Sequence, residues 1–211
     1  NQRLKFYTAA GKYVRSQIES VLSQIKDDTL IIVTGDHGEA HWEQIELARL
    51  FTDSRPAHGA GHGGTPWDMV ARVPLSVHDP GGVLTTPNSG GWPSLVDIPK
   101  TLSERMNLST EFDGISWGSV LPDDRGVICE GAHYGSERKA IYLNDEKLIY
   151  GEDDEVVLVG SVSRPQPGED LKRVSEIPEH FKKRLPKDNN GTKSGDLGSM
   201  AENQLEALGY K

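Results

Sequence analysis

Several features that define other protein classes are scarce in this sequence. It contains one cysteine, Cys129, which excludes an internal disulfide framework and any metal site built from several cysteines. No run approaches the roughly 18 apolar residues of a membrane-spanning helix. Basic residues are outnumbered, with 23 Lys and Arg against 32 Asp and Glu, and the net charge of −9 disfavours binding to nucleic acid or anionic membrane. We therefore expect a soluble globular protein.

The beginning of the sequence also lacks familiar signals. It opens on Asn1 rather than on an initiating methionine, shows no basic and then apolar targeting segment, and runs directly into a helical pattern. We expect the chain to be part of a longer protein. The sequence assigns neither a compartment nor an oligomeric state.

The first half predicts alternating helices and strands. Apolar residues three and four apart predict an amphipathic helix over 7–26. The β-branched run 29–34 is typical of a strand buried on both faces of a mainly parallel sheet. A short strand over 70–77 and a helix over 94–106 follow, with a short helix over 44–51 between the two strands. This order indicates an α/β fold.

The second half has a different pattern. Short β-prone runs predict a small antiparallel sheet over 126–160, with a hairpin turn at 144–146. Residues 163–199 are rich in Pro, Gly and charge and predict irregular structure. A final helix over 201–208 is expected to cover the sheet with its leucines. We therefore expect two regions, 1–122 and 123–211.

Candidate ligands follow the first predicted strand. Asp36 and His37 lie at its end between two glycines, and open α/β sheets bind ligands beside the carboxyl ends of their strands. Carboxylate and imidazole are also common donors to divalent cations. A glycine-rich loop then carries His58 and His62, which suggests a cationic or metal-binding cleft, although His41 and His58 are equally compatible with surface positions.

These residues belong to a series that resembles sulfatases of the alkaline phosphatase superfamily. The segment LIIVTGDHGE (30–39) is similar to the strand and DHG motif of that family. Later landmarks follow in the family's order: GHG (61–63), ARVPL (71–75), VDIPKTL (96–102), FDGIS (112–116) and LEALGY (205–210). The resemblance implies the C-terminal part of an alkaline-phosphatase-like α/β/α sandwich, followed by the small antiparallel sheet and its helix.

The resemblance also implies roles for four residues. Asp36 and His37 would bind one divalent cation, Ca²⁺ in the first instance, with Mg²⁺, Mn²⁺ and Zn²⁺ as alternatives. His62 would be catalytic, since it would contact the charged ester oxygens or protonate the leaving alcohol, and His37 would also contact the ester. Arg72 would support its strand. The substrate would be a sulfate ester of a small molecule or a glycan.

Two elements of the family are missing from the 211 residues. The nucleophile motif, Cys or Ser followed by x-Pro-x-Arg, and the paired upstream aspartates are not present, and the residues after Cys129 do not fit. Two alternatives to a sulfatase therefore remain. One is a phosphodiesterase, phosphonate hydrolase or phosphoethanolamine transferase of the same superfamily, and the other is an inactive binding or structural remnant.

Overall fold

The computed structural model describes residues 2–43, 60–82, 84, 91–131, 138–151, 156–161, 170–173 and 176–185. Contacts divide the chain into two compact units, Asn1–Ile177 and Pro178–Lys211. The boundary expected between residues 122 and 123 stays a prediction. The described residues combine helices with strands, which confirms the α/β class in its general sense, whereas the sandwich stays a prediction.

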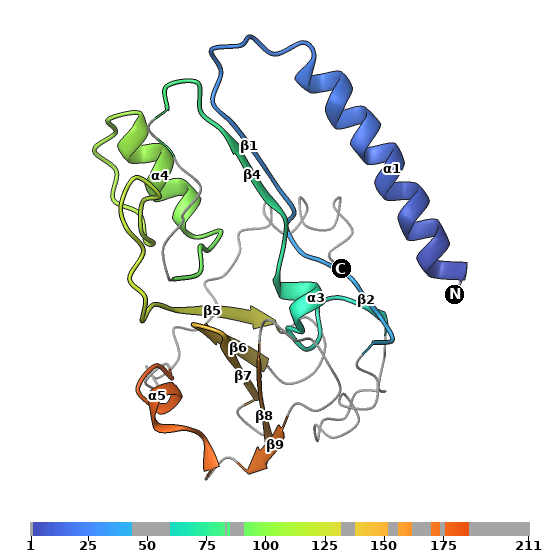
Figure 1. Cartoon of the computed structure of the whole chain (residues 1–211), viewed down its shortest axis with the longest axis vertical. Coiled ribbons are helices and arrows are strands. Elements are labelled where there is room, and N and C mark those ends of the chain that lie inside the picture. The colour runs from blue at the N-terminus through green and yellow to red at the C-terminus, as the bar shows by residue number, and fades with distance from the viewer. Residues whose placement is uncertain are drawn as a thin grey trace, which may run out of the picture. The chain divides into compact units, whose positions relative to one another are not determined.

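Figure 1 shows the order of the helices and strands. The first unit contains α1 (Gln2–Leu22), β1 (Ile31–Thr34), β2 (Ala40–His41), β3 (Ala60–Gly61), α3 (Asp68–Ala71), β4 (Leu75–His78), α4 (Asp97–Arg105), β5 (Gly126–Gly131), β6 (Arg138–Leu143), β7 (Glu146–Gly151), β8 (Val156–Ser161) and β9 (Asp170–Arg173). The second unit contains α5 (Glu179–Lys182). Both β9 and α5 lie within the segment that was expected to be irregular.

The expected helix and strand at the start of the chain are confirmed as α1 and β1, but their surroundings differ from the prediction. β1 pairs with β4 in the antiparallel direction, from Ile31 opposite His78 to Thr34 opposite Leu75. Every strand pair among the described residues is antiparallel, so the expectation of a mainly parallel sheet is wrong for this part of the chain. None of the four β1 residues is fully buried. A continuous β-branched run is therefore compatible with a strand that is only partly covered.

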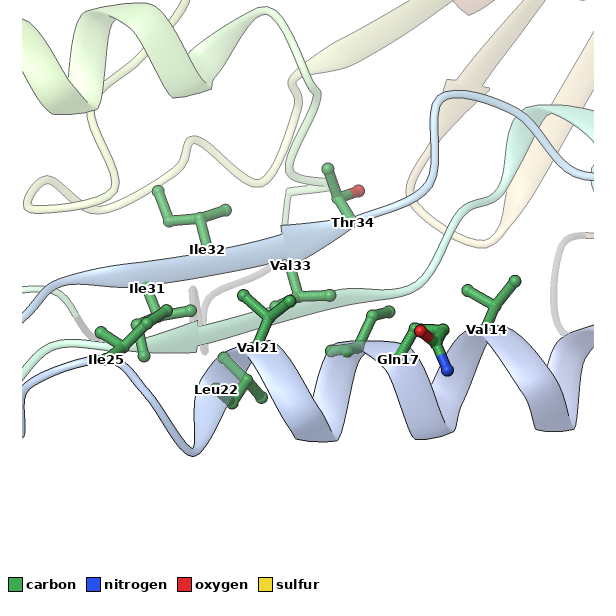
Figure 2. A pocket seen from close by; sticks show the side chains of 10 residues that line it. Val14, Gln17, Val21, Leu22, Ile25, Ile31, Ile32, Val33 and Thr34 are labelled. Atoms are coloured by element: carbon green, nitrogen blue, oxygen red, sulfur yellow. The ribbon is translucent and has the colours of Figure 1, made fainter.

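Helix α1 covers β1 loosely. Along β1, Ile31 and Val33 point toward the helix, whereas Ile32 and Thr34 point to the other face (Figure 2). An apolar groove of about 510 Å³ lies between the two elements. Val14 and Val21 on its helical side remain 52% and 58% exposed, so α1 is not close-packed against the strand.

The antiparallel sheet expected over 126–160 is confirmed. Strands β5 to β9 form a five-stranded sheet in which each strand pairs with the next along the chain. The expected hairpin joins β6 to β7 through a two-residue turn, since Leu143 lies opposite Glu146. Asn144 in this turn has a φ of 52°, a left-handed conformation that asparagine tolerates better than most residues.

A hydrophobic core joins this sheet to the segment around α3. Its buried members are Trp67, Ala140, Tyr142 and Ile149, and partly buried residues pack around them. Cys129 of β5 is one of the latter. Burial, followed by the charge of Glu130, raises the pKa of the Cys129 thiol, so the thiol is kept in its unreactive protonated form.

Helix α4 is fixed by a buried carboxylate. Asp97 has no exposed side-chain surface and binds Arg125 through two hydrogen bonds of 2.6 and 2.7 Å. The backbone N–H groups of Ser94 and Ile115 also donate to it, at 2.8 and 2.9 Å. Burial raises the pKa of Asp97, but the bonds from Arg125, Ile115 and Ser94 outweigh burial and lower the pKa below its ordinary value. The hydrogen bond from Ile115 therefore attaches the segment 112–116 to the start of α4.

We expect Asp97→Asn to lower the free energy of unfolding at pH 7 by about 2–3 kcal/mol, because hydrogen bonds to charged groups are the stronger kind. The ionised carboxylate stabilises the fold above the unfolded-state pKa of about 3.9, and this contribution is lost as the pH falls through the lower folded-state pKa. Urea titrations from pH 7 to about pH 3 measure the difference between the two proteins. A difference that does not shrink in acid would contradict this role of Asp97.

Two further sequence predictions concern segments that the structure leaves out. The helix expected over 44–51 and the C-terminal helix over 201–208 lie outside the described residues. Within the described ranges, no helix has both the length and the apolar character needed to cross a membrane.

Candidate functional site

The residues that follow β1 form a turn that is held against α3. Gly38 donates its backbone N–H to the carbonyl of Val70 at 2.8 Å. A Cβ atom at position 38 would overlap the carbonyl oxygen of Met69, so no residue with a side chain fits there. The glycine of the DHG motif is therefore required because two backbone segments touch there.

A very short ladder brings the glycine-rich loop to this turn. β2 pairs with β3 through only two residue pairs, Ala40 with Gly61 and His41 with Ala60. Extending the same register by one residue beyond the Ala40–Gly61 pair places Glu39 opposite His62, although 23 positions separate them in the sequence. Gly61 has a φ of 111°, a conformation that favours glycine, and the chain turns there into the loop that carries His62.

The structure brings His37 and His62 together. Their rings are stacked, with centroids 3.7 Å apart and an angle of 30° between the ring planes. Nδ1 of His37 lies 2.8 Å from the carbonyl oxygen of Gly38. A carbonyl can only accept a hydrogen bond, so Nδ1 carries the proton and Nε2 of the neutral ring is left as the electron-pair donor.

Asp36 lies beside this ring. One of its carboxylate oxygens accepts the backbone N–H of His37 at 2.9 Å, and the other lies 3.8 Å from Nε2 of His37. Two donors that bind one ion at about 2.0–2.6 Å each can be separated by this distance. The Asp36 side chain is 74% exposed, so the site is open to solvent. Asp36 and His37 thus fit the role of two ligands to one divalent cation.

Glu39 is a residue of this site for which the sequence predicts no role. Its Oε2 lies 2.8 Å from Nδ1 of His62, and its Oε1 accepts a hydrogen bond from Arg3 of α1 at 2.9 Å. The Glu39 side chain is only 14% exposed. Partial burial raises its carboxyl pKa, but the bonds and charges of His62 and Arg3 outweigh this and lower the pKa below its ordinary value.

His37, Glu39 and His62 form a cluster of candidate metal ligands. One donor atom of each lies within 4.8 Å of the other two, and Asp36 is not part of this set. Both oxygens of Glu39 are engaged, one by His62 and one by Arg3. This arrangement suits a carboxylate that orients a histidine better than one that binds an ion directly.

The other histidines and Arg72 lie elsewhere. The ring of His41 makes an edge contact with Tyr7 of α1, with centroids 4.7 Å apart. His58 lies outside the described residues. The guanidinium of Arg72 stacks over the ring of Trp92 at 4.9 Å. These positions give His41 and Arg72 packing contacts.

Buried polar contacts hold the residues that follow His62 in place from the side of the sheet. Immediately after the loop, Thr65 accepts a hydrogen bond from Arg138 of β6 at 2.6 Å. Asp68 of α3 pairs with the fully buried Lys147 of β7 at 2.6 Å and accepts a bond from Tyr142 at 3.0 Å. Burial, together with the neighbouring Asp68 carboxylate, raises the pKa of Tyr142, which therefore keeps the proton that it donates.

Comparisons with known proteins add no relative to this description. No family model matches the sequence, and no curated protein or solved structure matches it. The motif order in the sequence and the geometry around His37 and His62 therefore remain as the indications of function.

Proposed function

We propose that this chain carries part of the active site of a metal-dependent hydrolase of sulfate esters. The observation that supports this most is the convergence of His37 and His62, which come from separate motifs of the sulfatase-like series and stack at 3.7 Å. Asp36 lies beside the same imidazole. Charge neutralisation at an ester requires ligands for a dication, and proton transfer requires a second group, here a histidine, next to them.

In this proposal Asp36 and His37 hold a divalent cation, Ca²⁺ or one of Mg²⁺, Mn²⁺ and Zn²⁺. When bound, the cation neutralises the charged ester oxygens. His62 donates a proton to the leaving alcohol or stabilises the charged oxygens, and a histidine suits this work because it titrates near neutrality. Two protein ligands are few for Ca²⁺, which prefers 6–8 oxygens. The proposal therefore assigns the remaining ligands and the nucleophile to residues outside these 211.

The test is an assay of the natural gene product on 4-nitrophenyl sulfate and on the corresponding phosphate mono- and diesters. We expect hydrolysis of the sulfate that a chelator abolishes and an added divalent cation restores. His62→Gln should lower kcat by about 10²–10⁴, the usual contribution of a general acid or base. His78→Gln is the matched control, since His78 is exposed at the end of β4 and should not affect kcat.

Three outcomes would overturn the proposal. Faster hydrolysis of a phosphate ester would place the protein with the phosphoesterases of the same superfamily. Hydrolysis unaffected by His62→Gln would remove His62 from the site. A gene product inactive on every ester, with or without added cation, would favour the inactive remnant.

A further inference from the structure

The contacts around Glu39 determine which ring nitrogen of His62 carries the proton. A neutral imidazole can carry its proton on Nδ1 or on Nε2, and the two forms present different atoms to a substrate. The form that a histidine adopts is set by the hydrogen bond of its other nitrogen. The question for His62 is therefore which group holds Nδ1.

Glu39 holds it. An ionised carboxylate can only accept hydrogen bonds, so the 2.8 Å contact between Oε2 and Nδ1 requires the proton to be on Nδ1 of His62. Nε2 is then the atom left for exchange with a substrate. The ring cannot tilt easily either, because it stacks on His37 at 3.7 Å.

Glu39 is itself held in position. Its second oxygen accepts a hydrogen bond from Arg3 at 2.9 Å, and Arg3 belongs to the first turn of α1. The neighbouring residue Gly38 fixes the backbone, because a side chain at position 38 would collide with Met69. A carboxylate fixed at both ends and bound to a histidine is the arrangement that orients catalytic imidazoles in general.

We propose that Glu39, clamped by Arg3, is a positioning residue that holds His62 in the Nδ1–H form and directs Nε2 to the ester. This inference rests on the proposed function for its catalytic consequence, but not for the pairing itself. In the reaction, the Nδ1–H ring first takes a second proton from water on Nε2, and the resulting imidazolium gives this Nε2 proton to the bridging oxygen as an oxygen nucleophile from outside these 211 residues bonds to sulfur and the bond from sulfur to the bridging oxygen breaks. The Nδ1 proton stays in the bond to Glu39, which stabilises the imidazolium before the transfer.

The first measurement is the protonation pattern of the His62 ring in the 211-residue chain, read from nitrogen-15 NMR of the imidazoles at about pH 8, where ordinary histidines are neutral. We expect the Nδ1–H form in the wild type. Glu39→Ala should convert His62 to the Nε2–H form, and Glu39→Gln should keep the Nδ1–H form, because its amide oxygen still accepts. Glu19→Ala is the matched control, since Glu19 pairs with Arg15 at an exposed position of α1.

The second measurement is kinetic and uses the natural gene product. Glu39→Ala should lower kcat by about 10²–10⁴ with KM changed less than about threefold, because orientation acts on the chemical step. Glu39→Gln should recover part of this loss, and Arg3→Met should cost less than Glu39→Ala.

The outcomes separate this inference from the proposed function. If His62 in Glu39→Ala kept the Nδ1–H form, or if an active enzyme kept its kcat in that variant, the positioning role would be overturned while the hydrolase assignment stood. If the ring converted as expected but the gene product hydrolysed no ester, the proposed function would fail and the pairing of Glu39 with His62 would stand.

Discussion

Asp36→Ala in the natural gene product is expected to lower the rate of ester hydrolysis at least about a thousandfold. The carboxylate is one of the two cation ligands that this chain offers, and a bound cation contributes several kcal/mol of transition-state stabilisation, with each 1.36 kcal/mol worth a factor of ten. The measurement is kcat/KM on the best substrate, with and without added divalent cation. Because the Asp36 side chain is 74% exposed, the substitution should leave the fold intact.

Two controls make this result specific. Asp123→Ala removes another exposed aspartate, far from the site in sequence, and should leave kcat/KM unchanged. The 211-residue chain assayed alone should hydrolyse neither aryl sulfates nor aryl phosphates, because it contains no recognisable nucleophile motif. Normal activity of Asp36→Ala would return Asp36 to the role of an ordinary turn residue, and metal-dependent turnover by the chain alone would reveal a complete active site that the motifs do not show.

Lys147→Met is expected to destabilise the fold by about 3–5 kcal/mol, which is the usual result of removing one partner of a buried ion pair. Lys147 is fully buried and lies 2.6 Å from Asp68, whose carboxylate would be left buried without a positive charge beside it and with a hydrogen bond from the neutral Tyr142 hydroxyl. Urea unfolding at pH 7 measures the loss.

The double variant Asp68→Leu/Lys147→Met provides the matched comparison. Replacing both members of a buried pair by apolar side chains is often close to neutral, so most of the stability should return. A double variant as unstable as the single one would show that packing around Lys147, rather than its charge, determines the cost.

The sequence predicted the local structure better than the long-range pairing. Helix α1 and the strands between β5 and β8 follow from periodicity and turn residues, which act over short distances. The direction of the β1–β4 pair does not, because a continuous β-branched run fits a parallel and an antiparallel neighbour equally well. The expected parallel sheet therefore failed in the described residues, although the strand itself was placed correctly.

The candidate site was only partly predictable, for a similar reason. Asp36, His37 and His62 carry a recognisable motif order, and the structure brings the two histidines together. Glu39 belongs to the same motif. Its contact with His62, 23 residues later, could not be predicted, because a two-residue ladder is too short to produce a recognisable strand pattern in the sequence. The contact of Arg3 with Glu39 could not be predicted either, because nothing in the sequence distinguishes this arginine from any other in the first turn of a helix.

The two-residue ladder between β2 and β3 has a consequence for motion. Local opening in a folded protein costs only the contacts of the part that opens, and few backbone bonds hold this ladder, whereas β5 to β9 form an extended network. Separation of His62 from the turn that carries His37 would therefore break the Glu39–His62 bond and the ring stack but only a two-residue ladder, so we expect it to cost less than global unfolding. Assembly of the two histidines would then be a conformational equilibrium of its own, which the cation and ester of the proposed function would shift toward the stacked state.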